Sequence, residues 1–180
     1  METYIILLRG VMPTGKNKVP MAELRVALEK AGLKNVQTYI QSGNAIVKSS
    51  MKSSDLEKLV YQVIKKDIGA DIAVVAKTAT QFGKIAENNP FVGEDTKKTY
   101  FTLLAQKPES KIMKDFASSD YSPEKVSVVG DVVYTLYATK YRDSKFNNNF
   151  IERKLGVSAT TRNFNTLTKL VELAQHRREI

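Results

Sequence analysis

An amphipathic run at residues 54–69 indicates a helix that packs on another layer. Ser54 and Glu57 match a capping box at its start, and Gly69 ends the run. The apolar side chains between them recur at the spacing of one helical face: Leu56, Leu59, Val60, Val63 and Ile64. Because a helix buries its apolar stripe against a neighbouring element, this run predicts another element packed beside it.

Short β-prone runs on either side of this helix indicate the strands of a sheet. Four such runs occur, at residues 3–8, 36–40, 45–48 and 72–76. Gly43 marks a turn between the middle two, and a further helix is expected from Pro20 to Gly32. The resulting order, β-α-β-β-α-β, is that of a ferredoxin-like unit with an antiparallel sheet.

The same order of elements recurs in the second half of the chain. The expected strands are residues 100–105, 126–129, 132–138 and 157–160, and the expected helices are residues 110–116 and 148–155. Thr160 or Thr161 is expected to start a last helix, whose apolar stripe runs from Phe164 to Ala174.

We therefore predict an α+β protein built from two ferredoxin-like βαββαβ subdomains, related by duplication, plus a C-terminal helix. The first subdomain is expected to cover residues 1–78. The second is expected to cover residues 79–180 and to include a connecting helix near its start.

Composition excludes several kinds of site. The chain has no cysteine, and His176 is its only histidine. Disulfides, thiolate metal sites and His-dependent catalytic triads therefore lack their side chains, and we expect no metal and no cofactor. No catalytic constellation is identifiable, which leaves enzymatic activity open. No run approaches the roughly 20 apolar residues of a membrane span, so we expect a cytoplasmic protein without a membrane partner.

The formal net charge is +9, and both halves contribute to it. A distributed positive field favours encounters with polyanions, so non-specific nucleic-acid binding is one interpretation. Residues 140–145 interleave basic and aromatic side chains and are compatible with a phosphate backbone, but we favour a solvated surface followed by an asparagine-rich helix cap. Base stacking on the sheet, as in RNA-recognition motifs, is not expected, because the strand at residues 45–48 has no aromatic side chain.

Two polar segments are expected to meet at one end of the first sheet. In a βαββαβ unit the loop after the first strand lies beside the turn between the second and third strands. We expect an anionic or phosphorylated small ligand there, held by the following residues: Arg9, Lys16, Asn17, Tyr39, Gln41, Ser42 and Asn44. Arg162 and Asn163 are expected to complete the site if the last helix packs against that end. The alternatives are nucleic-acid binding and an enzyme that acts on a nucleotide-like substrate.

Part of the first loop matches a Walker A motif. Gly10, Gly15 and Lys16 have the required spacing, but Asn17 stands where the motif has Ser or Thr. The hydroxyl that binds Mg²⁺ is therefore missing, and Pro20 delays the helix that should begin at the lysine. These departures argue against an NTPase.

Several short runs resemble a known family. They are Leu7-Leu8-Arg9-Gly10, Gly15-Lys16-Asn17, Thr38-Tyr39-Ile40-Gln41-Ser42-Gly43-Asn44 and Thr161-Arg162-Asn163-Phe164-Asn165-Thr166. The chain resembles the bacterial domain-of-unknown-function family numbered sixteen ninety-seven. This resemblance implies a duplicated ferredoxin-like fold and supplies no activity. The family's first loop usually reads RGINVGGKN, whereas Met12 and Thr14 depart from it here.

Overall fold

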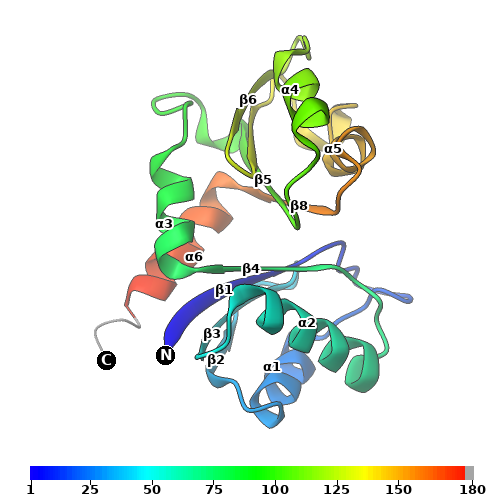
Figure 1. Ribbon diagram of the computed structural model, residues 1–180, viewed down its shortest axis with the longest axis vertical. Coiled ribbons are helices and arrows are strands. Elements are labelled where there is room, and N and C mark those ends of the chain that lie inside the picture. Colours follow the sequence, from blue (N-terminus) through cyan, green and yellow to red (C-terminus); the bar gives the residue numbers. More distant parts are fainter. Residues whose placement is uncertain (177–180) are drawn as a thin grey trace. The chain divides into compact units, whose positions relative to one another are not determined.

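The computed structural model describes residues 1–176 and confirms the predicted fold class (Figure 1). It contains two four-stranded antiparallel sheets, each accompanied by helices. The chain divides into two compact units. One comprises Met1–Lys84 with the chain from Lys169 onward, and the other comprises Ile85–Thr168. The predicted domain boundary between residues 78 and 79 stays a prediction.

The first unit follows the predicted order of elements. These are β1 (Glu2–Leu8), α1 (Met21–Lys30), β2 (Lys34–Thr38), β3 (Asn44–Ser49), α2 (Ser53–Val63), the π-helical turn η1 (Ile64–Ile68), β4 (Val74–Thr78) and the start of α3 (Ala79–Glu87). The strands lie in the order β2-β3-β1-β4, and each neighbouring pair is antiparallel. Figure 1 shows α1 and α2 on the same side of this sheet.

Both faces of the central strand β1 are buried. Tyr4, Ile6 and Leu8 belong to the core formed with the apolar stripes of α1 and α2. The alternate side chains Ile5 and Leu7 are fully buried as well. A strand buried on both faces has a continuous apolar run, which explains the sequence of β1. The sheet face opposite α1 and α2 is therefore not an exposed platform on which bases could stack.

The second unit repeats this arrangement. Its elements are η2 (Thr96–Lys98), β5 (Thr99–Leu104), α4 (Ser110–Ser118), β6 (Lys125–Val129), β7 (Val132–Leu136), η3 (Tyr141–Asp143), α5 (Asn148–Leu155), β8 (Ala159–Asn163) and the start of α6 (Phe164–Gln175). Its strands lie in the order β6-β7-β5-β8. In both sheets the order is therefore second, third, first and fourth strand, as a duplication requires.

The predicted start of the last helix is wrong. Thr160 and Thr161 lie in β8, and α6 begins at Phe164. The Oδ1 of Asn163 accepts a hydrogen bond from the backbone N–H of Thr166 (2.8 Å) and so caps the helix. Threonine suits both an N-cap and a strand, and here the strand prevails because Thr161 pairs with Thr102 of β5, their hydroxyls 2.8 Å apart.

The predicted capping box at α2 is also wrong. The helix begins at Ser53, and the preceding Lys52 makes no side-chain cap. The Oε1 of Glu57 instead accepts a hydrogen bond from the N–H of Ala76 in β4 (2.8 Å). In the second unit the Oε1 of Glu152 accepts from the N–H of Ala159 in β8 (2.8 Å). Each unit thus ties its second helix to its fourth strand with a glutamate.

The helices that follow the fourth strands are equivalent. Thr78 pairs with Tyr4, and Asn163 pairs with Tyr100, so the two occupy the same place in the two sheets. Thr78 exchanges hydrogen bonds with Gln81 at the start of α3: its Oγ1 accepts at 3.2 Å and its N–H donates at 2.9 Å. Each fourth strand therefore leads directly into a capped helix, and the repeated motif is βαββαβα.

Candidate functional site

The register of β1 and β3 confirms that the loop after β1 meets the β2–β3 turn. Leu7 pairs with Asn44, and the N–H of Leu8 donates to the carbonyl of Gly43 (2.8 Å). The loop at residues 9–20 starts at this point, beside the turn at residues 39–43. These two segments are called the loop end below.

Gly43 allows the two segments to pack in direct contact. Its φ of 91° lies in the left-handed region that glycine tolerates. A Cβ on Gly43 would lie 2.6 Å from Cγ2 of Val11 and 2.8 Å from Cβ of Leu8. No larger residue fits here unless the loop moves away from the turn.

The polar side chains of the turn hold its own conformation. Nε2 of Gln41 donates to the carbonyl of Val19 (3.0 Å), which fastens the turn to the chain just before α1. Nδ2 of the buried Asn44 donates to the carbonyl of Tyr39 (3.0 Å) and to Oγ of Ser42 (3.1 Å). The backbone N–H of the half-buried Tyr39 returns a bond to the carbonyl of Asn44 (2.9 Å). The side chains of this turn sequence therefore serve to hold the turn's conformation and its place against the loop.

The first loop folds back on itself. The N–H of Met12 donates to the carbonyl of Asn17 (2.9 Å), and the N–H of Lys18 donates to that of Gly15 (3.2 Å). Lys16 and Lys18 are exposed, and Asn17 is half-buried. Since α1 begins only at Met21, the loop lacks the helix start that a P-loop places at its lysine.

The loop end carries positive charge without internal acids. Residues 9–20 and 39–43 contain Arg9, Lys16 and Lys18 and no Asp or Glu. Arg9 is half-buried, and its backbone N–H donates to the carbonyl of Ala73 (3.0 Å).

The acid closest in sequence to that contact is already engaged. Asp71 accepts a hydrogen bond from the hydroxyl of Tyr61 (2.8 Å) and pairs with Lys65 (3.3 Å). The bond from Tyr61, followed by those from Lys65, lowers the pKa of Asp71. Its negative charge is thus directed toward Lys65.

Two apolar side chains are exposed at the same end. Ile40 is 48 % exposed and has φ of 47°, and Met12 is 53 % exposed. A β-branched residue in the left-handed region is uncommon and strained. Sequence patterns do not reveal this conformation, and the predicted strand at residues 36–40 ends earlier, at Thr38.

Arg162 and Asn163 lie in β8 of the second unit. Arg162 is only 8 % exposed, and its Nη1 donates to Oγ1 of Thr160 (2.8 Å) and to the carbonyl of Thr161 (2.9 Å). Burial lowers its pKa to about 10, so it remains a cation at neutral pH. Asn163 caps α6, as described above.

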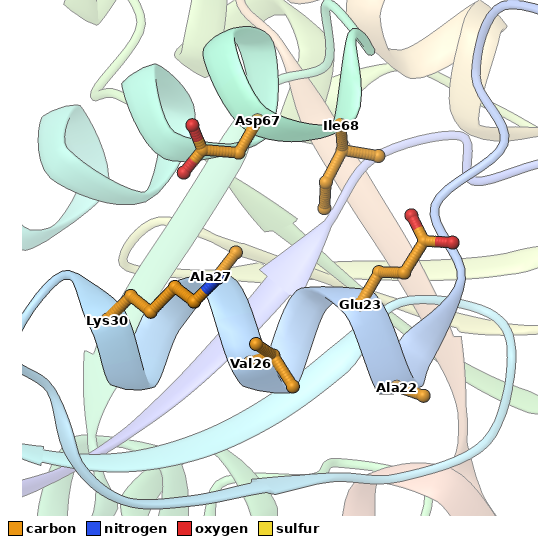
Figure 2. Close-up of a pocket in the computed structure, with 7 residues that line it drawn as sticks. All are labelled: Ala22, Glu23, Val26, Ala27, Lys30, Asp67 and Ile68. Atoms are coloured by element: carbon orange, nitrogen blue, oxygen red, sulfur yellow. The ribbon is translucent and has the colours of Figure 1, made fainter.

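A cavity of about 490 Å³ lies elsewhere in the first unit, between α1 and η1 (Figure 2). Figure 2 shows the side chain of Ile68 pointing toward α1, on which Val26 is 41 % exposed. The charged residues that line this cavity are two acids, Glu23 and Asp67, and one base, Lys30, so the lining does not favour an anion. None of its lining residues was predicted as a site residue.

Within residues 1–176, no group of three or more His, Asp or Glu side chains is placed to hold a metal ion. Over the same residues, no helix combines the length and the apolar character that crossing a membrane requires.

Comparison with known proteins identifies the family. The model of a family described as protein of unknown function (DUF1697) matches residues 1–134. The chain belongs to this family. The DUF1697 match includes the loop end and its turn sequence, whereas the run at residues 161–166 lies beyond the matched residues. No curated protein matches the chain.

A solved structure with the same fold is the conserved bacterial protein SP0830 from Streptococcus pneumoniae. The two are 22 % identical, the TM-score is 0.78, and the similarity covers 97 % of this chain and 99 % of that one. At this identity the likeness establishes the fold alone.

Proposed function

We propose that this DUF1697 protein binds a small anionic or phosphorylated ligand at the loop end of its first sheet. The proposal rests on one observation: the loop end holds three cations and no acid on a closely packed backbone. Lys16 and Lys18 supply exposed charge at the loop, and Arg9 lies where the loop begins.

The backbone beneath these cations is preorganised. The contact of Gly43 with Val11 and the bond from Gln41 to Val19 fix the loop against the turn. A preorganised site loses less conformational entropy on binding than a mobile loop does. The amides of Asn17 and Gln41 and the hydroxyl of Ser42 add directional hydrogen bonds to the ligand's oxygens.

Titration with inorganic pyrophosphate, followed by NMR of the backbone amides, tests the proposal. We expect saturable shifts concentrated at residues 12–18 and 41–43. K16A/K18A should weaken binding at least tenfold and leave the thermal midpoint nearly unchanged, because both lysines are exposed. K58A/K66A removes the same charge from α2 and η1 of the same unit and serves as the control.

The comparison of the two variants decides the outcome. A loss below twofold in K58A/K66A, beside the tenfold loss in K16A/K18A, supports a local site. An equal loss in both, with shifts spread over the surface, would mean that only net charge attracts the anion. R9K separates geometry from charge at the third cation: weaker binding with the charge retained indicates a directional guanidinium contact.

A further inference from the structure

A second cavity, of about 480 Å³, lies wholly within the second unit. It opens where β5 begins and the chain leaves β7, and its lining includes two tyrosines and three lysines: Tyr100, Tyr141, Lys97, Lys98 and Lys140. This volume falls within the range of small-molecule sites, which is roughly 300–1,000 Å³.

The two tyrosines form a stacked pair. Their ring centroids are 4.8 Å apart and their planes differ by 15°. Tyr137 packs against both rings at nearly right angles, with centroids 5.2 Å and 5.3 Å away. The hydroxyl of Tyr141 also accepts a hydrogen bond from the N–H of Asn148 (3.1 Å). The stack is thus held from several sides, and both rings remain only partly buried against the core of this unit.

The lining has a net positive charge. Its two acids are Asp95 and Asp143, and each already has a partner. Oδ1 of Asp95 accepts from the backbone N–H of Lys97 (2.9 Å), and Asp143 pairs with Arg142 (3.7 Å). Three exposed ammonium groups therefore lie around an aromatic surface.

The duplication shows that this cavity is an addition to the repeated fold. Tyr4 occupies in β1 the place that Tyr100 has in β5. Tyr4 is only 4 % exposed, and its hydroxyl donates to the carbonyl of Met51 (2.7 Å). Tyr100 is instead half-buried and lines the cavity.

The difference arises in the connection between the third strand and the second helix. In the first unit it spans residues 50–52, and in the second unit it spans residues 137–147. The longer connection contains Lys140 and η3, and it places the ring of Tyr141 on that of Tyr100. Long connections on a shared scaffold commonly carry function.

We propose that this cavity binds a nucleobase together with its adjoining phosphate. The base stacks on the Tyr100–Tyr141 pair, and the phosphate contacts Lys97 and Lys140. Aromatic rings accept any base through its π face, and a neighbouring ammonium neutralises the phosphate. A free nucleotide and a nucleic-acid strand share this chemistry. The site is independent of the loop end and belongs to the other unit.

Calorimetric titration of the full chain with adenosine 5′-monophosphate, adenosine and inorganic phosphate tests the proposal. The nucleotide should bind at least tenfold more tightly than either fragment, because only it engages both parts of the cavity. K97A/K140A should weaken binding of the nucleotide at least tenfold and leave the affinity for adenosine within twofold. K111A/K114A removes two exposed lysines from α4 of the same unit and should change neither.

Two tyrosine variants separate stacking from the hydroxyl. Y141L removes the ring and should weaken binding of both adenosine and its monophosphate at least fivefold. Y141F keeps the ring and should bind as the unaltered protein does. If Y141L fails to fold, amide shifts in the unaltered protein decide instead, because the nucleotide should perturb residues 97–100 and 139–143 most.

Equal affinity for the nucleotide and for inorganic phosphate would overturn the proposal, as would equal losses in K97A/K140A and K111A/K114A. A deoxyadenosine octamer identifies the source of the ligand. Affinity within tenfold of the mononucleotide indicates a free nucleotide, whereas affinity at least a hundredfold higher, falling steeply with salt, indicates a strand. Either result supports the base-and-phosphate chemistry. K16A/K18A should not affect this titration, so failure at one site is distinguishable from failure at the other.

Discussion

Gly43 and Val11 lie so close that a Cβ on the glycine would be 2.6 Å from Cγ2 of the valine. The loop after β1 and the turn before β3 are therefore fitted to each other at the level of single atoms. This contact is the structural basis of the proposed anion site, and it can be tested without any ligand.

We expect G43A to destabilise the protein by about 2–4 kcal/mol, because a left-handed conformation and an overpacked contact add together. Gly15, in the loop after β1, offers a matched control. Its φ is 82°, and nothing lies within 4 Å of a Cβ there, so G15A should cost about 1 kcal/mol through backbone strain alone. Urea denaturation of both variants measures the difference. Equal losses would show that the close packing adds nothing.

Replacement of Ile40 by glycine should stabilise the protein. Its φ of 47° costs an isoleucine about 1–2 kcal/mol, and its half-exposed side chain contributes little burial in return. I40G should therefore raise the denaturation midpoint, contrary to the usual effect of glycine. I112G, at an exposed isoleucine inside α4, should lower the free energy of unfolding by about 1 kcal/mol. A lower midpoint in I40G would mean that Ile40 makes a stabilising contact that outweighs its strain.

Glu57 should make stability depend on pH in an unusual direction. Its partial burial raises the pKa of the carboxyl above its ordinary value, although the bond from Ala76 and the charge of Lys77 oppose this. Between the unfolded and folded pKa values the native state binds more protons than the unfolded state, so Glu57 contributes a fall in stability as pH rises through that window.

E57Q keeps an acceptor for the N–H of Ala76 and removes the charge. At a pH below 4.5 E57Q should be as stable as the unaltered protein, and at neutral pH it should be more stable. E57L removes the acceptor and should lose about 1–3 kcal/mol at every pH, since the N–H of Ala76 is left without its partner. Thermal unfolding from pH 3.5 to 7.5 measures both. A constant offset between E57Q and the unaltered protein would contradict the predicted titration.

Two threonines of the second sheet should respond oppositely to replacement by valine. The hydroxyl of Thr161 donates to Oδ1 of Asn148 and lies 2.8 Å from that of Thr102, so T161V should cost about 1–2 kcal/mol. Within the described residues, the buried hydroxyl of Thr135 has no hydrogen-bond partner, and that of nearby Tyr137 donates to the carbonyl of Phe146. T135V should therefore be neutral or stabilising by about 1 kcal/mol. Losses of similar size in the two variants would show that Thr135 has a partner in solution.

Periodicity was sufficient to predict the elements of the first unit, because β1 and the stripes of α1 and α2 are buried over several turns. It failed where one residue type suits two structures. Thr160 and Thr161 resemble helix caps in sequence, and only pairing with β5 assigns them to a strand. Glu57 has the spacing of a capping box, but its partner lies on β4, 19 residues away.

The loop end could be predicted from topology, since strand order alone brings residues 9–20 beside the β2–β3 turn. The strained φ of Ile40 and the atomic fit of Gly43 could not, because they depend on contacts between segments. The only sequence signal for the cavity of the second unit was the group of basic and aromatic residues near Tyr141. Its other wall comes from residues 95–100, which nothing in the local sequence connects to it.

The placement of α3 and α6 has a consequence for dissecting the molecule. The boundary between the two units falls within α3, after Lys84, and again within α6, after Thr168. Both crossings therefore run through hydrogen-bonded helical backbone. Proteolysis or gene truncation at either boundary would sever a helix in mid-turn, leaving each fragment with a broken end. Cuts that respect the repeat would instead follow whole βαββαβα modules, so the repeating units and the compact units do not coincide.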